Sequence, residues 1–316
     1  MTKRCSICVV GSANVDLTFR TARLPQPGET VAGQSMSAGM GGKGANQAVA
    51  AARLGAEVTF VARVGNDAYG TEAIRSYQAE GIDATFVQKD QQLPTGTAAI
   101  VVDDQAENCI IAVPGANSSL KPQDVADALP AIRRADSVVC QLEIPLDVAF
   151  EAFRLARSLN VRTVLTPAPA MELPDEFLRL CDICVPNKTE VELLTGTAIT
   201  NARDAHIAAD KLRARGVGLV VVTMGSNGVL VVDDCGATAV PALKVSAVDP
   251  TGAGDAFTAG FAVFLSAGFT VIEAVQRATV VAALTVTRHG AQTAFPQLAE
   301  IDEYVRLHPS TAAACC

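Results

Sequence analysis

Residues 41–64 read GGKGANQAVAAARLGAEVTFVARV, a glycine-rich turn that leads into a helical pattern and then a strand pattern. Alanine-rich residues at helical spacing predict a helix over Ala45–Leu54, and Gly55 stands where a glycine commonly follows a helix. The β-branched run Val58–Val64 predicts a strand buried on both faces. A similar run at Ile7–Gly11 completes a strand–helix–strand unit, which is typical of a parallel sheet.

The same alternation continues along the chain and defines the fold class. We therefore expect an α/β fold with a doubly wound, mostly parallel sheet flanked by helices, in a single domain spanning residues 1–316. Further strands are predicted at Ser137–Gln141, Arg162–Thr166 and Leu219–Thr223, and further helices at Ala73–Ala79, Leu146–Leu159 and Ala205–Arg215.

Two segments break this alternation. Thr18–Ser37 contains two prolines and two glycines without a helical stripe, and Thr97–Val113 contains two apolar strands joined by the polar turn Asp103–Asn108. A small antiparallel sheet, built from about residues 15–40 and 95–114, would account for both segments. The alternative is a pair of unusually long surface loops.

Composition excludes several classes of protein. Hydrophobic residues make up 49% of the chain and charged residues 18%, which excludes a disordered chain. The net charge of −8 shows no basic stripe for nucleic acid, although backbone amides in an acidic protein can still hold a phosphate. Apolar stretches such as the one from Val280 are too short to span a membrane. The start MTKRCSICVVGS is basic, but its apolar part ICVV is too short for the hydrophobic region of a signal peptide, and no small-residue cleavage site follows it. We expect a cytoplasmic protein with no nucleic-acid or membrane partner.

The chain contains nine cysteines, four of which form two C-x-x-C spacings. Cys5/Cys8 and Cys181/Cys184 both fall in apolar runs that resemble buried strands. In a strand, residues i and i+3 point to opposite faces, so the two sulfurs of each pair should diverge. Buried free thiols are therefore favoured over zinc ligands, and the odd count fits a reducing compartment.

The segment from Asp249 to Asp255, DPTGAGD, precedes a long apolar helical pattern. Its small residues allow a ligand to approach the backbone, and the first amides of a helix lack internal partners. These amides and the positive helix end form an anion site. Asp255 could instead be a simple helix cap, but that leaves Asp249 and the Thr-Gly-Ala-Gly spacer unexplained.

A second glycine-rich segment, Gly41–Gln47, precedes the first predicted helix. Its spacing is wrong for a Walker A loop, and it does not directly follow a strand, so a dinucleotide fingerprint is unsupported. Together with Asn14 and Asp16, just beyond the first strand, it places polar groups above the strand ends. Open α/β sheets bind ligands at that edge.

These two segments together resemble the ribokinase branch of the pfkB-type carbohydrate kinase family, which also contains adenosine kinases and fructokinases. Further similarities follow in order along the chain: GSANVDL, PGETVAG, QLEIP, TPAPA, NKTE, TMGSNG and VTRHGAQ. The resemblance implies a transferase that moves the γ-phosphoryl group of ATP to the 5-hydroxyl of D-ribose, giving D-ribose 5-phosphate for ribose catabolism.

The resemblance also assigns roles to individual residues. Asp255 would act as the base, with Gly252, Ala253 and Gly254 at the helix start forming the anion hole. Read without the resemblance, Glu143 could be an ordinary strand-end carboxylate and Lys43 a surface charge. The sugar would contact Asn14, Asp16, Gly42, Lys43, Asn46, Glu143 and Asp255.

On the nucleotide side, Asn187 and Glu190 match a family motif that helps to place Mg²⁺, although the same pattern is also a helix cap. The segment around Ser226 could be a plain hairpin turn, and Thr279 is assigned only by counting along the chain. The resemblance implies ATP contacts from Asn187, Thr223, Gly225, Ser226, Gly228, Gly254 and Thr279.

The resemblance further implies a monovalent cation, usually K⁺, held mostly by backbone carbonyl oxygens. The corresponding positions are Asp249, Thr251, Thr285, Arg288 and Gly290. Three residues depart from the family pattern: Pro250 and Ala294 stand where Thr and Ser are common, and Thr166 replaces an Asn. The first two weaken the expectation of cation dependence, and the third should alter a hydrogen-bond network without contacting the base.

In the family, the small sheet is a lid over the sugar, and two lids form a homodimer. Ile100, Ile110 and Ile111 would then face sugar or partner and not solvent.

Alternatives to a ribokinase are a kinase for deoxyribose, fructose or a nucleoside, and a non-catalytic sugar or nucleotide sensor. A hydride-transfer enzyme is disfavoured because the dinucleotide fingerprint is missing.

Overall fold

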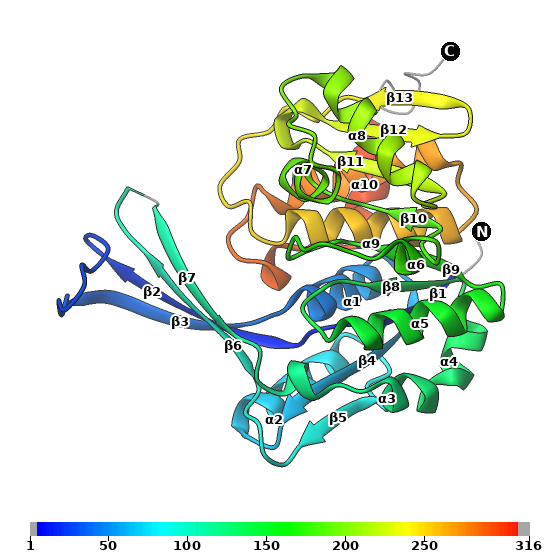
Figure 1. The fold of residues 1–316 in the computed structure, drawn as a ribbon. Coiled ribbons are helices and arrows are strands. Elements are labelled where there is room, and N and C mark those ends of the chain that lie inside the picture. Colours follow the sequence, from blue (N-terminus) through cyan, green and yellow to red (C-terminus); the bar gives the residue numbers. More distant parts are fainter. Residues whose placement is uncertain (1–4, 106, 309–316) are drawn as a thin grey trace.

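The computed structural model of the chain describes residues 5–105 and 107–308. A nine-stranded sheet runs through the centre of the molecule (Figure 1). It is parallel from β11 to β5, whereas β12 and β13 are added antiparallel at one edge. In spatial order the strands are β13 (Gly236–Val240), β12 (Val229–Asp233), β11 (Leu219–Thr223), β10 (Ile183–Cys184), β9 (Arg162–Leu165), β8 (Ser137–Cys140), β1 (Ser6–Val10), β4 (Glu57–Gly65) and β5 (Val87–Asp90).

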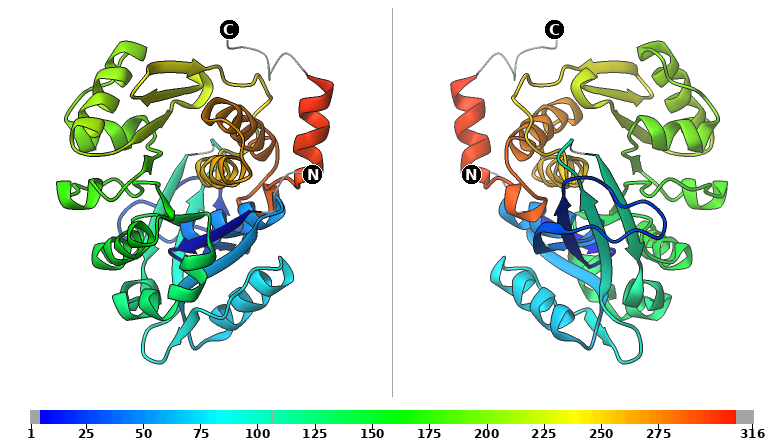
Figure 2. Two further views of the ribbon diagram at one scale, coloured as in Figure 1. Left: turned by 90° about the vertical axis from the view of Figure 1, so that its right-hand side faces the viewer. Right: turned by 90° about the vertical axis from the view of Figure 1, so that its left-hand side faces the viewer.

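Helices cover both faces of this sheet (Figure 2), which confirms the doubly wound prediction. Ile7 and Val9 of β1 pack into one hydrophobic cluster, and Cys8 and Val10 pack into the other. One face carries α1 (Lys43–Arg53), α2 (Ala68–Ala79), α9 (Ala253–Ser266), α10 (Val271–Thr285) and α11 (Leu298–Leu307). The other carries α3 (Pro122–Asp127), α4 (Leu129–Arg134), α5 (Leu146–Ser158), α6 (Asp175–Leu178), α7 (Lys188–Thr195) and α8 (Ala202–Ala214). In the described part of the chain, no helix is long and apolar enough to cross a membrane.

The predicted elements exist, and their ends shift where a cap overrides the apolar pattern. Helix α2 begins at Ala68 and not at Ala73, because Oδ1 of Asp67 accepts a hydrogen bond from the Gly70 amide at 2.7 Å. Helix α1 ends near its predicted limit, and Gly55 follows it with φ of 87°.

A second, four-stranded sheet projects from the body of the molecule (Figure 1). Hairpins β2/β3 and β6/β7 are each antiparallel, and β2 joins β6 by a parallel pairing. The two irregular segments are therefore strands of one sheet and not surface loops. In spatial order the strands are β3 (Gly33–Gly41), β2 (Asn14–Thr21), β6 (Gly96–Val102) and β7 (Asn108–Val113).

The two C-x-x-C pairs differ in their placement. Cys5 and Cys8 lie in opposite hydrophobic clusters, as predicted. Cys181 and Cys184 lie in the same cluster, so the prediction of divergence is wrong for this pair. The reason is that β10 is only two residues long and Cys181 precedes it. Burial raises the pKa of both thiols well above the ordinary value.

Candidate active site

Polar residues predicted to bind ligands gather at the carboxyl edge of the parallel strands. Asn14 follows β1, Glu143 follows β8, Asn187 follows β10 and Thr223 ends β11. Because these strands are parallel, their carboxyl ends share one edge, where doubly wound folds bind ligands. The helix α9 begins close to this edge, since Asp255 contacts residues at the start of α1.

The tip of α9 has a backbone that exposes amides. Gly252 precedes the helix with φ of 77°, a conformation that residues with a Cβ rarely adopt. The Ala253 amide donates to the Pro250 carbonyl at 3.2 Å, so it is not free as the sequence suggested. The amides of Gly254 and Asp255 have no acceptor among the described residues. A Cβ built at Gly254 meets no atom within 4 Å, so an anion can approach this helix start closely.

The Asp255 carboxylate is buried and accepts two amide hydrogen bonds. Asn46 Nδ2 donates to Oδ2 at 2.9 Å, and Gln47 Nε2 donates to Oδ1 at 3.1 Å. Burial raises the pKa of Asp255, while Lys43 and these two bonds act in the opposite direction. The structure thus brings Asn46 to the predicted base. Gln47, its neighbour on α1, was not singled out from the sequence.

The glycine-rich bend fits α1 tightly against the end of β1. A Cβ at Gly44 would lie 2.5 Å from the Ser12 amide nitrogen, and one at Gly42 would lie 2.8 Å from the Asn14 nitrogen. The Ala45 amide donates to the Ser12 carbonyl at 2.8 Å. This close packing places Lys43 and Asn46 at the edge where β1 ends.

Glu143 is more than a free strand-end carboxylate. Its Oε2 accepts from the Ser12 hydroxyl at 2.6 Å and from the Lys43 amide at 3.0 Å. Ser12 was not predicted, and its place two residues after the end of β1 is the signal that could have found it. Glu143 therefore ties the start of α1 to the end of β8.

Lys43 lies at the centre of a cluster of carboxylates. Burial opposes its charge, but Asp255, Glu143, Glu190 and Asp16 together raise its pKa. The reading of Lys43 as a solvated surface charge is therefore wrong.

Asp16 belongs to the same cluster. Burial, followed by the charges of Glu143 and Asp255, raises the pKa of Asp16 to about 6, with Lys43 opposing. The Asp16 carboxylate lies against the neighbouring strand, since a Cβ at Gly41 would meet its Oδ2 at 2.2 Å.

Asn14 is held by a residue that the sequence did not single out. Asn117, in the 3₁₀ helix η1 (Gly115–Ser119), is buried and accepts from the Ala13 amide at 2.8 Å. This bond fixes which end of the Asn117 amide is oxygen. Its Nδ2 then donates to Asn14 Oδ1 at 2.7 Å, so the Asn14 NH₂ group faces elsewhere and can donate to a ligand.

Asn187 and Glu190 form a capping box at the start of α7. Asn187 Oδ1 accepts from the Glu190 amide at 2.9 Å, and Glu190 Oε2 accepts from the Asn187 amide at 2.8 Å. Their role as a cap is thus confirmed. Glu190 is also buried and interacts electrostatically with Lys43 and Asp255, so the same carboxylate belongs to the charged cluster.

The remaining predicted nucleotide contacts lie farther along the sheet edge. The β11–β12 connection is a hairpin whose turn is η2 (Gly225–Asn227), and Gly228 closes it. Asn187 and Thr223 form a backbone bridge, which links this hairpin to α7. Thr279 is buried in α10 and its hydroxyl donates to the Val275 carbonyl at 2.9 Å. No described contact joins Thr279 to the other site residues.

The two loops predicted to hold a cation are bonded to each other. Asp249 Oδ2 accepts from the Gly290 amide at 2.9 Å, and Oδ1 accepts from the Thr251 amide at 2.9 Å. The Thr285 hydroxyl donates to Val281 within α10, and the Arg288 guanidinium pairs with Glu300. The guanidinium has no lone pair for a cation, so Arg288 can offer only its carbonyl oxygen, whereas Thr285 has its carbonyl and its hydroxyl oxygen.

Thr166 is linked to Asp255 through the side chain of Gln47. Its Oγ1 accepts from Gln47 Nε2 at 3.1 Å, and this nitrogen also donates to Asp255. Thr166 donates in turn to Thr258 Oγ1 at 3.1 Å. The departure from the family pattern thus lies beside the candidate base without touching it.

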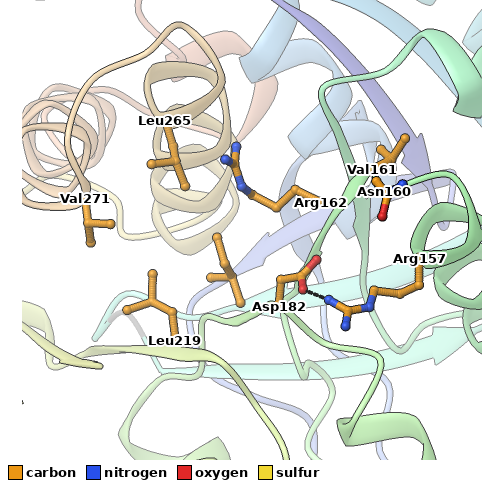
Figure 3. Close-up of a pocket in the computed structure, with 9 residues that line it drawn as sticks. Arg157, Asn160, Val161, Arg162, Asp182, Leu219, Leu265 and Val271 are labelled. Atoms are coloured by element: carbon orange, nitrogen blue, oxygen red, sulfur yellow. Dashed lines mark hydrogen bonds and ion pairs between the residues drawn. The ribbon is translucent and has the colours of Figure 1, made fainter. Parts of the chain in front are cut away.

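A cavity of about 570 Å³ lies at the opposite edge of the sheet (Figure 3). It is lined by residues at the amino ends of strands, among them Arg162 and Leu219, and by the Arg157–Asp182 ion pair. None of the predicted site residues lines it. The charged cluster around Asp255, and not this cavity, is the candidate active site.

Comparison with known proteins gives one consistent family. The model of the pfkB family of carbohydrate kinases matches residues 5–298. A ribokinase of Staphylococcus aureus is 38% identical, with 94% of this chain and 98% of that protein aligned. A deoxyribokinase of Salmonella typhi is 37% identical over 96% and 99% of the two chains. The structure of an Arabidopsis thaliana ribokinase complexed with ribose and ATP superposes with a TM-score of 0.90 and 31% identity, covering 96% and 99% of the two chains.

Proposed function

Because the chain belongs to the pfkB family of carbohydrate kinases, we propose that it transfers the γ-phosphoryl group of ATP to the 5-hydroxyl of D-ribose. Relatives named ribokinase align over nearly the whole chain, and the fold is that of a ribokinase solved with ribose and ATP. The chain is therefore an ATP-dependent sugar kinase. We propose in addition that its acceptor is ribose and that the 5-hydroxyl is phosphorylated.

The observation that carries the mechanism is the buried Asp255 carboxylate at the tip of α9. Burial raises its pKa, which makes it a stronger base toward an alcohol than an ordinary aspartate. In this mechanism Asp255 accepts the proton of the attacking hydroxyl. The amides of Gly254 and Asp255 stabilise the transferring phosphoryl group, and Lys43 offsets the charge that accumulates nearby.

The polar set beside Asp255 suits a free pentose. Asn14 can donate through its NH₂ group, while Asp16 and Glu143 can accept from sugar hydroxyls. Hydrogen-bonding groups discriminate a polyol far better than an apolar pocket does. A nucleoside kinase would need an apolar base pocket, so this set favours a sugar.

The donor set of Glu190 and Asn187 fits a Mg²⁺ ion that retains most of its waters, because the ion needs only one or two protein oxygens. Both residues stand at the start of α7, and Glu190 lies within electrostatic reach of Asp255. Bound there, Mg²⁺ would neutralise charge on the phosphates. ATP would extend past Thr223 toward the hairpin of Gly225, Ser226 and Gly228.

The loops around Asp249 and Gly290 are bonded to each other through the Asp249 carboxylate, and a K⁺ ion is proposed to bind beside them, mostly through backbone carbonyl oxygens. Such a cation would fix the segment that leads into α9. K⁺ is thus proposed as an activator of the reaction, although Pro250 and Ala294 depart from the family pattern and weaken the expectation that the reaction depends on it.

We also propose that the four-stranded sheet is a lid and a dimer interface. In its register, Ile100 and Ile110 share the face of Asp16, whereas Ile111 lies on the other face. Exposed apolar residues on that other face are Phe19, Met36, Ile111 and Val113. A second copy of the chain would cover them, and the dimer would act in the cytoplasm.

A panel of ribose, deoxyribose, fructose and adenosine with Mg-ATP, each with and without K⁺, tests the substrate assignment. We expect the highest kcat/KM for ribose and a higher rate with K⁺. Deoxyribose is the nearest rival, since a deoxyribokinase is as similar as the ribokinases. Faster turnover of another acceptor would overturn the assignment, and binding without turnover of any would indicate a sensor.

A further inference from the structure

Two chains of buried side-chain amides converge on the Asp255 carboxylate. In the first, Gln141 Nε2 donates to Gln47 Oε1 at 2.6 Å, and Gln47 Nε2 donates to Asp255 Oδ1. In the second, Gln292 Nε2 donates to Asn46 Oδ1 at 3.2 Å, and Asn46 Nδ2 donates to Asp255 Oδ2. Each carboxylate oxygen therefore ends one chain.

The four amides are buried and come from separate parts of the fold. Asn46 and Gln47 lie on α1, Gln141 follows β8, and Gln292 begins η3 (Gln292–Ala294). The exposed fractions are 0% for Gln141, 1% for Gln47, 6% for Asn46 and 9% for Gln292. Burying amides is costly unless they are paired, and the four side chains are paired with one another and with Asp255, although Gln141 Oε1 has no partner among the described residues.

The direction of each hydrogen bond is set by Asp255. An ionised carboxylate only accepts, so Asn46 and Gln47 must turn their NH₂ groups toward it. Their oxygens then point outward and require donors, which Gln292 and Gln141 supply. Without its outer donor, an inner amide could rotate and present its oxygen to Asp255, which would be repulsive.

We propose that Gln141–Gln47 and Gln292–Asn46 form a two-armed relay that fixes the rotation of the Asp255 carboxylate for catalysis. This inference rests on the proposed role of Asp255 as the base. Gln47, Gln141 and Gln292 are positioning residues, because they act on the reaction only through Asp255. Asn46 keeps a second N–H that can still reach the sugar.

The Gln292 arm also connects the site to the loop around Gly290. Gln292 stands at the end of that loop, and Arg53 Nη1 of α1 donates to its backbone carbonyl at 2.6 Å. The Asp255 carboxylate is thus held on one side by the sheet, through Gln141, and on the other by the loop that follows α10.

Methionine variants of similar length test the relay with the best sugar acceptor and Mg-ATP. We expect Gln47→Met to lower kcat about tenfold, since a hydrogen bond to a charged group is lost, and to leave the sugar KM within about twofold. Gln141→Met should lower kcat about threefold in the wild-type background but have no further effect on kcat when Gln47 is already Met. Gln292→Met lies in the other arm and should still lower kcat in that background.

The matched control is Ser137→Ala, which removes a partly buried hydrogen bond to Ser266 at the opposite end of β8. It should lower the melting temperature without changing kcat. The relay is overturned if Gln141→Met lowers kcat equally in both backgrounds, or if no Met variant differs in kcat from the control. If Gln47→Met does not fold, the Gln141→Met/Gln292→Met double variant replaces it, and a wild-type kcat there would also overturn the relay. A wild-type protein inactive on every sugar would instead refute the proposed function.

Discussion

Asn46 and Asp255 are 209 residues apart in the chain, yet Nδ2 of Asn46 lies 2.9 Å from Oδ2 of Asp255. The bond joins the start of α1 to the start of α9, the two glycine-rich helix tips of the molecule. A sugar hydroxyl held above α1 would therefore meet the carboxylate and the free amides of α9 together. The contact brings two short segments that are distant in sequence into one candidate site.

Replacing Asn117 with Asp should weaken sugar binding. The variant keeps the oxygen that accepts from Ala13 but replaces the donor to Asn14 with a second oxygen. The Asn14 amide then turns its NH₂ group toward residue 117 and away from the sugar. We expect the ribose KM to rise about tenfold with kcat little changed, measured by steady-state kinetics. Ser118→Ala, which removes only a bond to Gly115 in the same turn, is the control. If Asn117→Asp lowered the melting temperature but left the ribose KM unchanged, Asn117 would contribute only to stability and not to sugar binding.

Asp16 should make the protein less stable as pH rises. Its pKa is raised from 3.8 to about 6, so the folded state takes up a proton that the unfolded state lacks between these values. Stability contributed by this group therefore falls as pH increases from about 4 to 6. Asp16→Asn, which stays neutral, should raise the melting temperature at pH 8 and leave it unchanged near pH 3.5, while raising the ribose KM. Equal melting temperatures at pH 8 would contradict the raised pKa.

Glu190→Gln should increase the Mg²⁺ concentration needed for half-maximal activity several-fold, because the carboxylate proposed to hold the ion becomes neutral. The chain offers a matched control in Glu273, which forms the same capping box with Thr270 at the start of α10. Glu273→Gln should weaken a helix cap without changing the Mg²⁺ requirement. Identical Mg²⁺ titrations of the two variants would assign Glu190 to capping alone.

Ile111→Glu should separate the proposed dimer. The side chain is 63% exposed in the single chain and lies on the face of the small sheet away from Asp16. A charge there would be buried without a partner in the dimer. Light scattering coupled to size exclusion should give a dimer for the wild type and a monomer for the variant. Leu193→Glu, at an exposed position of α7, is the control and should leave the mass unchanged. A monomeric wild-type protein would refute the interface.

Strands β1, β4, β8, β9 and β11 of the main sheet could be predicted from the sequence because each is a short β-branched run. Strands β5, β10, β12 and β13 were not predicted. The parallel pairing of β2 with β6 could not be predicted, because it joins segments far apart in the chain and no local pattern encodes their register. The short length of β10 could not be predicted either, because it depends on which residues pair with the neighbouring strands. Only Ile183 and Cys184 do so, and Cys181 lies before the strand.

The site residues divide in the same way. Asp255, Lys43 and Glu143 lie in sequence motifs that indicate their chemistry. In the structure they form one charged cluster with Asp16. Ser12, Gln141 and Asn117 carry no such signature, because their roles arise only where separate elements converge. The assignment of Thr279 by counting along the family pattern stays a prediction, since its hydroxyl donates to Val275 within its own helix and contacts no other site residue among those described.

The most direct test of the account is the kcat of Asp255→Asn with ribose and Mg-ATP, measured beside its thermal unfolding. The variant should fold normally and lose at least about a hundredfold in kcat, the lower range for loss of a general base. Asp255→Ala, which places no new N–H against Asn46 and Gln47, should show a similar loss. Wild-type kcat in a folded variant would contradict the role of Asp255 and the mechanism built on it.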